Sequence, residues 1–177
     1  MEAIQTLHEQ GKFEKFGLSN FTKEQILEWH SYAKSKGRPS AEFPGSYSIA
    51  VRGNETALFP TLRELGISVQ AYSPIDAGLS VKAPEFIAAA KGSRDPTTMM
   101  GRMRQDLYNK PAYMKMPAEF SKLMDNLGLS RSSVAHRWLK YHSALDGSLG
   151  DGLLLGAISS EQLEESLLVL EKGPLEP

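Results

Sequence analysis

Apolar positions recur along the chain at two spacings, one typical of amphipathic helices and one typical of short buried strands. Near the start, Ala3, Ile4 and Leu7 share one face of a predicted helix. The segment FEKFGLSN follows and predicts a short strand that ends near Leu18. The chain is therefore expected to open with a helix and a strand.

A capping box marks the start of the next predicted helix. Thr22 and Gln25 have the spacing of a residue that caps a helix and a residue that reaches back to the cap. This helix is predicted to end near Gly37. Its buried face is predicted to carry Ile26, Trp29 and Ala33.

The same strand and helix unit recurs over residues 42–72. Residues 42–47 predict a second short strand or a strand end, because Pro44 cannot donate a ladder hydrogen bond and forbids a regular central ladder there. A helix is predicted after Asn54 and stops at Gly66. Its apolar positions are Ala57, Leu58, Leu62 and Leu65. The segment ISVQAY then predicts the third strand.

Prolines, glycines, methionines and scattered basic residues interrupt this pattern over residues 73–117, which predicts a long loop of the kind that often forms a lid. Helices are predicted again over about 117–127 and 130–142. A fourth strand over 153–156 and a helix over 159–170 complete the chain. Strands separated by helices predict an α/β fold with a parallel sheet, whose chemistry lies at the carboxyl ends of the strands.

Composition narrows the classes of function. The 177 residues, 41% hydrophobic and 23% charged, predict one domain with a core of its own. The formal net charge is −1 and the sequence has no basic block, so we expect neither nucleic acid nor a membrane surface as a partner. No apolar run approaches the length that spans a membrane.

The cysteine and histidine content bears on location and on metals. The chain has no cysteine, which is consistent with a reducing compartment, and MEAIQTLHEQ lacks the pattern of a secretory signal, so we expect a cytoplasmic protein. The four histidines have no neighbouring ligand at metal-site spacing. We therefore expect no bound metal.

Three tracts resemble the aldo-keto reductases, and within them the aflatoxin-aldehyde-reductase-like branch. They are GKFEKFGLSNF, YSIAVRGNETALFPTLRELGISVQAYSPI, and LLLGAISSEQLEESL followed by GPLEP. The resemblance covers nearly the whole chain in order. It implies an eight-stranded parallel barrel ringed by helices, and an enzyme that uses NADPH to reduce an aldehyde or a ketone to an alcohol, in some fungal relatives within secondary metabolism.

These tracts match the second half of that barrel. A full barrel of this type takes about 250 residues, so the resemblance implies a truncated domain over residues 1–177, with about four strands. The catalytic aspartate, tyrosine, lysine and histidine of the family lie in the first half, and the resemblance assigns no catalytic residue here. Four strands leave two open edges and, we expect, an apolar inner face. We therefore expect two copies to pair as a homodimer that covers this face.

The resemblance assigns part of a nicotinamide site. Ser19 and Asn20 match the pair that hydrogen-bonds the carboxamide, and Tyr72 matches the aromatic residue on which the nicotinamide ring stacks. Ser73, next to Tyr72, leads into a loop over the pyrophosphate. Taken alone, Ser19 and Asn20 fit a simple turn, and Tyr72 fits core packing. Pro44 stands where the family has a glutamine.

The resemblance also assigns phosphate contacts. Arg102, after Gly101, matches a Gly-Arg pair in the long loop, where its guanidinium fork suits a phosphate. A solvated loop arginine is the alternative. Three residues match the site for the adenosine 2′-phosphate and adjoining groups: Gly156, Ser159 and Gln162. Their alternative is a capped surface helix with nothing bound at its N-terminus.

Two departures from the family favour that alternative. Ile158 stands where the family often has a polar or basic residue, and Ser166 replaces the usual asparagine.

Three hypotheses follow for the chain: an NADPH-dependent carbonyl reductase, a catalytically inactive module that binds a nucleotide, and a fragment without activity. The residues do not select a particular carbonyl substrate.

Overall fold

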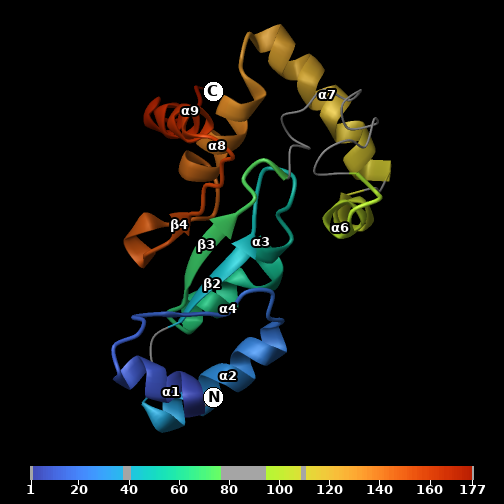
Figure 1. Cartoon of the computed structure of the whole chain (residues 1–177). Helices are drawn as coiled ribbons and strands as arrows, with labels where there is room; N and C mark the ends of the chain where they lie inside the picture. The colour runs from blue at the N-terminus through green and yellow to red at the C-terminus, as the bar shows by residue number, and fades with distance from the viewer. Residues whose placement is uncertain (1, 38–40, 77–94, 109–110, 177) are drawn as a thin grey trace. The chain divides into compact units, whose positions relative to one another are not determined.

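The computed structural model of the chain describes residues 2–37, 41–76, 95–108 and 111–176. In order along the chain, the elements are α1 (Glu2–Glu9), β1 (Phe16–Gly17), α2 (Lys23–Lys36), β2 (Ala41–Ser46), α3 (Asn54–Ala57), α4 (Phe59–Glu64), β3 (Ser68–Tyr72), α6 (Met99–Tyr108), α7 (Pro111–Leu127), α8 (Arg131–Tyr141), the 3₁₀ helix η3 (Gly147–Leu149), β4 (Gly152–Leu153) and α9 (Ser160–Glu171). Figure 1 labels most of them.

These elements form two compact units. The first, which we call the sheet unit, comprises Met1–Ser46, Arg52–Tyr72 and Ala144–Leu154. The second, the helical unit, comprises Tyr47–Val51, Ser73–Ser143 and Leu155–Pro177. A single domain over residues 1–177 stays a prediction.

The sheet unit has the predicted α/β architecture. Its four strands lie in the order β1-β2-β3-β4, and each neighbouring pair is parallel. Figure 1 labels β2, β3 and β4 of this sheet. Helix α2 connects β1 to β2, and α3 with α4 connect β2 to β3. The fold-class prediction of a partial parallel barrel with four strands and flanking helices is confirmed. The fourth strand begins and ends earlier than predicted, at Gly152–Leu153.

Strand β2 pairs with β1 only at Ala41 and Glu42, so at Pro44 it has a partner on the β3 side alone. The prediction that Pro44 forbids a regular central ladder there is confirmed. Pro44 lies beside Gln70 in the ladder with β3. The carbonyl of Glu42 accepts from the N–H of Leu18 on the β1 side (2.9 Å). Since backbone directions alternate along a strand, the nitrogen of Pro44 also faces that side. Strand β1 has already ended at Gly17, so the missing N–H costs little.

The two faces of the sheet differ in polarity. Phe43 lies beside Val69, and both are buried in the core under α2 and α4 with Ile26 and Leu62. The opposite face, by strand alternation, carries small and polar residues that are mostly only partly buried: Gly17, Glu42, Pro44, Ser46, Ser68, Gln70, Tyr72 and Gly152. The expectation of an apolar inner face is therefore wrong, because apart from Pro44 and Tyr72 the apolar residues of these strands lie on the face of Phe43 and Val69.

Local signals in the sequence account for the ends of α2. The hydroxyl of Thr22 accepts from the N–H of Gln25, and the Gln25 side chain accepts from the N–H of Thr22, so the predicted capping box is confirmed. Gly37 ends the helix with a positive φ of 61°, a conformation that suits glycine. The three residues predicted to be buried on α2 are buried: Ile26, Trp29 and Ala33.

The helix predicted after Asn54 is instead two short helices. The helix is interrupted at Leu58, where φ is −130° and ψ is −41°. Pro60 follows at the start of α4, and a proline is favoured in the first turn of a helix but cannot continue a preceding one. The break lets α4 bury Phe59 and Leu62 against the sheet.

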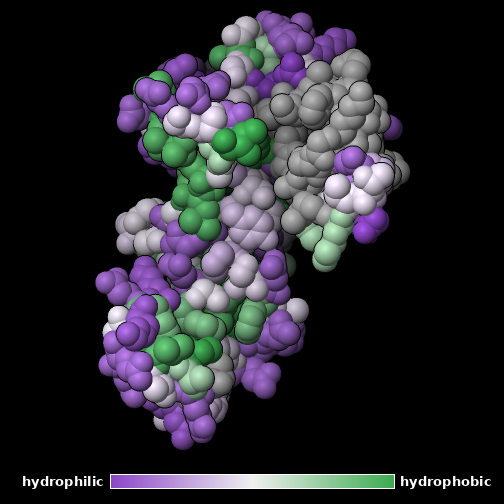
Figure 2. All heavy atoms as spheres, viewed as in Figure 1, coloured by the Kyte–Doolittle hydropathy of each residue, from purple (hydrophilic) through white to green (hydrophobic). Residues whose placement is uncertain are grey.

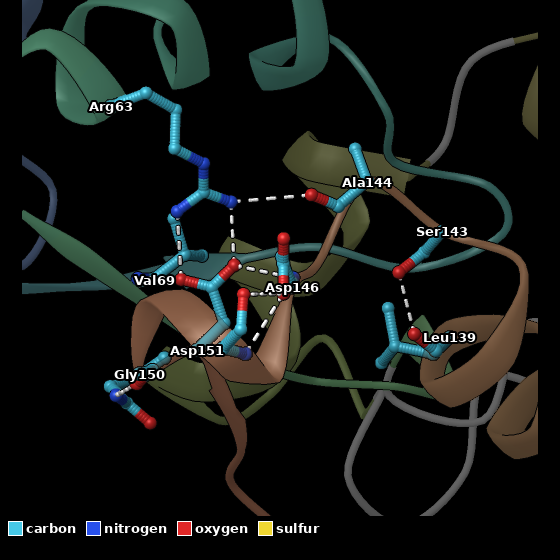
Figure 3. Close-up of polar contacts among 10 residues, drawn as sticks. Arg63, Val69, Leu139, Ser143, Ala144, Asp146, Gly150 and Asp151 are labelled. Carbon is cyan, nitrogen blue, oxygen red and sulfur yellow. Dashed lines mark hydrogen bonds and ion pairs between the residues drawn. The ribbon is translucent and has the colours of Figure 1, made fainter.

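A buried ion pair fastens β4 to the rest of the sheet unit. The carboxylate of Asp151 accepts from both terminal nitrogens of Arg63 on α4, at 2.8 and 2.5 Å. It also accepts from the N–H of Val69 (2.7 Å) and of Asp146 (2.8 Å), as Figure 3 shows. Since β4 has only two residues, this cluster supplies much of its attachment to β3.

The helical unit corrects the predicted loop over residues 73–117. Helix α6 lies within that stretch, and α7 begins at Pro111 rather than at Pro117. Thr98 contributes to the start of α6, because its hydroxyl accepts from the N–H of Gly101 (3.0 Å). Residues 77–94 of the predicted loop lie outside the described residues.

Helices α8 and α9 pack together in the helical unit. Lys140 and Tyr141 both donate to the carbonyl of Leu170, at 3.1 and 2.7 Å. Helix α9 keeps several apolar side chains in solvent, with Leu163, Leu167 and Leu168 at least 40% exposed. Figure 2 shows green atoms among the purple ones where Figure 1 labels α9.

Candidate cofactor site

Two of the predicted nicotinamide residues contact each other at the carboxyl ends of the strands. The hydroxyl of Tyr72, at the end of β3, donates to Oδ1 of Asn20, which follows β1 (3.1 Å). This bond uses the amide oxygen of Asn20, and the Nδ2 group carries two further N–H donors. The pair therefore offers an amide donor next to an aromatic ring, which is the chemistry that a carboxamide and its ring require.

Ser19 and Asn20 also form the simple turn that is the alternative to a binding role. Asn20 has a φ of 61°, in the left-handed region that asparagine tolerates better than most residues. Ser19 is exposed beside it in the same turn. A turn and a binding role are compatible here, because the turn is what brings the Asn20 amide to Tyr72.

Ser73 begins a tight turn after β3. Its φ is 59°, and its carbonyl accepts from the N–H of Asp76 (3.0 Å), whose own φ is 52°. The side chain of Asp76 is fully buried and accepts from the hydroxyl of Ser48, which is also fully buried. The sequence analysis did not single out Ser48 or Asp76, because a buried serine and aspartate 28 residues apart leave no local signal.

Arg102 lies on α6 rather than in a loop, which corrects both interpretations of its surroundings. Its Nη1 group donates to the carbonyls of Pro96 (3.4 Å) and Thr97 (3.2 Å), and the side chain is exposed. A Cβ added at Gly101 would lie 1.9 Å from the carbonyl oxygen of Asp95. The Gly-Arg pair thus has a structural role in starting α6, and the exposed guanidinium has further N–H groups besides Nη1 that can bind an anion.

Ser159 caps α9, as predicted. Its hydroxyl accepts from the N–H of Gln162 (3.4 Å), while Oε1 of Gln162 accepts from the N–H of Ile158 (3.3 Å). The reciprocal bond thus reaches one residue beyond the position that a capping box uses. A Cβ added at Gly156 would have no heavy atom within 4 Å, so no protein contact requires glycine there.

A carboxylate already lies at the N-terminus of α9. The pKa of Glu161 is lowered because the carboxylate accepts from its own backbone N–H and, to a smaller extent, from the hydroxyls of Ser159 and Ser160. Any phosphate that binds there must share these donors with a negative charge. The helix end is therefore a weaker anion site than its backbone geometry alone indicates.

Each unit by itself offers donors that suit one part of a dinucleotide cofactor. The sheet unit has an amide next to an aromatic ring at Asn20 and Tyr72. The helical unit has a guanidinium at Arg102 and, at Ser159, a hydroxyl at the N-terminus of a helix. Asn20 contacts Tyr72, and Ser159 contacts Gln162. Ser73 and Arg102 bond within their own turns.

Within residues 2–37, 41–76, 95–108 and 111–176, no group of histidine, aspartate and glutamate side chains is arranged to hold a metal ion. Over the same part of the chain, no helix is long and apolar enough to cross a membrane.

Known proteins match the chain along its whole length. The model of the aldo/keto reductase family matches residues 1–177. The oxidoreductase sirO of Leptosphaeria maculans is 42% identical over 178 residues, which are 99% of this chain and 54% of sirO. Human aflatoxin B1 aldehyde reductase member 4 is 34% identical over 188 residues, 100% of this chain and 56% of that protein. The chain thus spans about half the length of these curated relatives.

Proposed function

This chain belongs to the aldo/keto reductase family, and from that premise we propose that it serves as an NADPH-dependent oxidoreductase that reduces an aldehyde or a ketone to an alcohol. The similarity to proteins named as an oxidoreductase and as an aldehyde reductase supports the reaction class. Secondary metabolism as its setting rests on the resemblance alone. A cytoplasmic location is part of the proposal and is tested by fluorescence microscopy of a tagged chain.

The contact between Tyr72 and Asn20 is the observation that carries the proposal. NADPH, when bound, supplies the hydride. The Nδ2 group of Asn20 would donate to the carboxamide oxygen, and the Tyr72 ring would support the flat face of the nicotinamide. The contact joins residues that are 52 positions apart, and it supports the assignment of both to one nicotinamide site.

The helical unit by itself carries two groups that suit a phosphate. The Arg102 guanidinium suits the pyrophosphate or the 2′-phosphate, since its remaining N–H groups are charged donors. The Ser159 hydroxyl and the first N–H groups of α9 would hold the 2′-phosphate, against the charge of Glu161. We therefore propose NADPH with only a modest preference over NADH.

A titration calorimetry experiment tests cofactor binding directly. Purified chain 1–177 is titrated with NADPH, and Tyr72→Ala and Asn20→Ala are compared with Tyr32→Ala and Asn126→Ala, which change an exposed tyrosine on α2 and an exposed asparagine on α7. Tyr72→Ala should weaken binding at least tenfold, as loss of a ring contact and a hydrogen bond predicts. Equal affinities for all four variants would refute the site.

A catalytically inactive nucleotide-binding module is the second candidate. It rests on the same contact between Tyr72 and Asn20, because holding the nicotinamide does not by itself require a catalytic acid. A carbonyl that accepts a hydride must also receive a proton, so turnover requires an acid as well as a cofactor. Saturable NADPH binding without oxidation of NADPH in the presence of a panel of aldehydes would select this candidate.

We also propose that the chain forms a homodimer, on the open sheet edges that the sequence suggested and without the apolar inner face that it also suggested. Within the described residues, β1 and β4 each pair with a strand on one side only. Unpaired edges favour association with a further strand, and the exposed leucines of α9 add apolar surface. Sedimentation equilibrium tests this directly, and a single species of 19.5 kDa at every concentration would refute it.

A further inference from the structure

A fully buried serine and a fully buried aspartate join the loops that follow β2 and β3. Ser48 and Asp76 are both 0% exposed, and the Ser48 hydroxyl donates to Oδ1 of Asp76. The same hydroxyl oxygen accepts from the backbone N–H groups of Ala50 (3.2 Å) and Val51 (3.0 Å). A hydroxyl has two lone pairs and one proton. The two N–H groups use the lone pairs, and the proton is therefore directed at the carboxylate.

The Ser48–Asp76 pair holds a turn that its backbone alone disfavours. Ser73 and Asp76 have φ values of 59° and 52°, in the left-handed region where residues other than glycine are uncommon. Two such residues in one four-residue turn persist only when surrounding contacts hold them. The N–H of Asp76 closes the turn on the carbonyl of Ser73 (3.0 Å), and the Asp76 side chain ties it to Ser48.

Burying the carboxylate of Asp76 has a free-energy cost that an apolar side chain would not have. Removing an ionised group from water is unfavourable unless hydrogen bonds replace the water, and an apolar side chain of similar size usually serves packing as well or better. A role in fixing one backbone conformation explains why such a group is buried. Here the fixed conformation is that of Ser73 and Pro74, which directly follow Tyr72.

We propose that Asp76 and Ser48 are positioning residues for cofactor binding, which together hold the Ser73–Asp76 turn, directly after Tyr72, in one conformation before NADPH binds. This inference rests on the proposed function. Neither residue is assigned to touch the cofactor, because both side chains are fully buried. Their effect passes through the backbone of the turn, which the pair keeps in place before the cofactor arrives.

The experiment combines binding with amide exchange. Ser48→Ala, Asp76→Ala and the double variant are prepared with Ser48→Thr, which keeps the hydroxyl, and Asp125→Ala, an exposed carboxylate on α7, as controls. NADPH affinity is measured by calorimetry. Hydrogen exchange reports the amides of Val51 and Asp76, and circular dichroism establishes that each variant is folded.

Each single variant should weaken NADPH binding about tenfold, the effect of losing one hydrogen bond to a charged group. The double variant should bind NADPH about as tightly as whichever single variant binds it less tightly, because the two residues act as one unit. Ser48→Thr should restore most of the affinity. Faster exchange at Val51 and Asp76 should accompany the loss.

The outcomes separate the two proposals. If the unaltered chain fails to bind NADPH, the proposed function fails and this inference fails with it. If the unaltered chain binds and the folded Ala variants bind equally well, only this inference is overturned. Asp76→Asn covers the case in which Asp76→Ala does not fold, since its Oδ1 still accepts from Ser48, and it should weaken binding about threefold.

Discussion

Replacing Arg63 by methionine tests the ion pair that fastens β4 to the sheet unit. Methionine keeps the length and apolar stem of the side chain and removes its charge. The change leaves the Asp151 carboxylate, whose side chain is 1% exposed, with the N–H groups of Val69 and Asp146 as its remaining partners. Figure 3 shows how the guanidinium and these two groups converge on that carboxylate.

The expected cost follows from the burial of the pair. Leaving one partner of a fully buried ion pair uncompensated typically costs about 3–5 kcal/mol. The Arg63 side chain is 25% exposed, and two N–H donors still serve Asp151. We therefore expect Arg63→Met to lower the free energy of unfolding by about 2–3 kcal/mol, a large part of the stability of a small domain.

Urea unfolding followed by tryptophan fluorescence measures this loss, and Arg52→Met is the matched control. Arg52 pairs with Glu55 at 2.8 Å on the surface, and its side chain is 54% exposed. Such a pair contributes at most about 1 kcal/mol. If Arg63→Met costs no more than Arg52→Met, the reasoning about β4 is refuted. The double variant Arg63→Met with Asp151→Leu should regain part of the loss, because no charge then remains buried.

Three further predictions concern single residues. Gly37→Ala should lower the free energy of unfolding by about 1 kcal/mol, measured by thermal unfolding, because alanine disfavours the φ of 61° that ends α2. Thr22→Ala should cost about 1 kcal/mol at pH 7. The pKa of Glu24 is lowered by its own backbone N–H and then by the Thr22 hydroxyl, so the carboxylate stabilises the fold above its ordinary pKa, and this contribution is lost as pH falls through the lowered value. Thr22→Ala should therefore flatten the fall in stability below about pH 4.5; an unchanged pH profile would contradict this cause. Ile158→Lys should strengthen NADPH binding about threefold relative to NADH, because it places a cation beside the N-terminus of α9 where Ile158 is 94% exposed. Equal changes for both cofactors, measured by calorimetry, would place the 2′-phosphate elsewhere.

Signals carried by neighbouring residues were sufficient to predict much of the sheet unit. The Thr22 and Gln25 box and Gly37 mark both ends of α2, because caps act within one turn of a helix. Alternation of strand and helix patterns predicted the parallel order of the strands. The cap of α9 at Ser159 was likewise predicted from its own segment.

Predictions failed where the deciding partner was distant in sequence. The helix after Asn54 breaks at Leu58, since this lets Phe59 and Leu62 bury against the sheet. The polarity of the open sheet face was misjudged because the same alternating pattern fits either face until the helices are placed.

The sequence by itself determined the order of the elements, their capped ends and the resemblance to a family, since each of these depends on residues within a short segment or on the succession of segments. The tertiary structure alone decided which distant residues meet: Tyr72 with Asn20, Asp151 with Arg63, and Asp76 with Ser48. Each pair joins two different segments, and its geometry depends on strand register and loop closure across the sheet and its loops. That is why the residue types of the candidate site could be predicted, and the contacts that hold it could not.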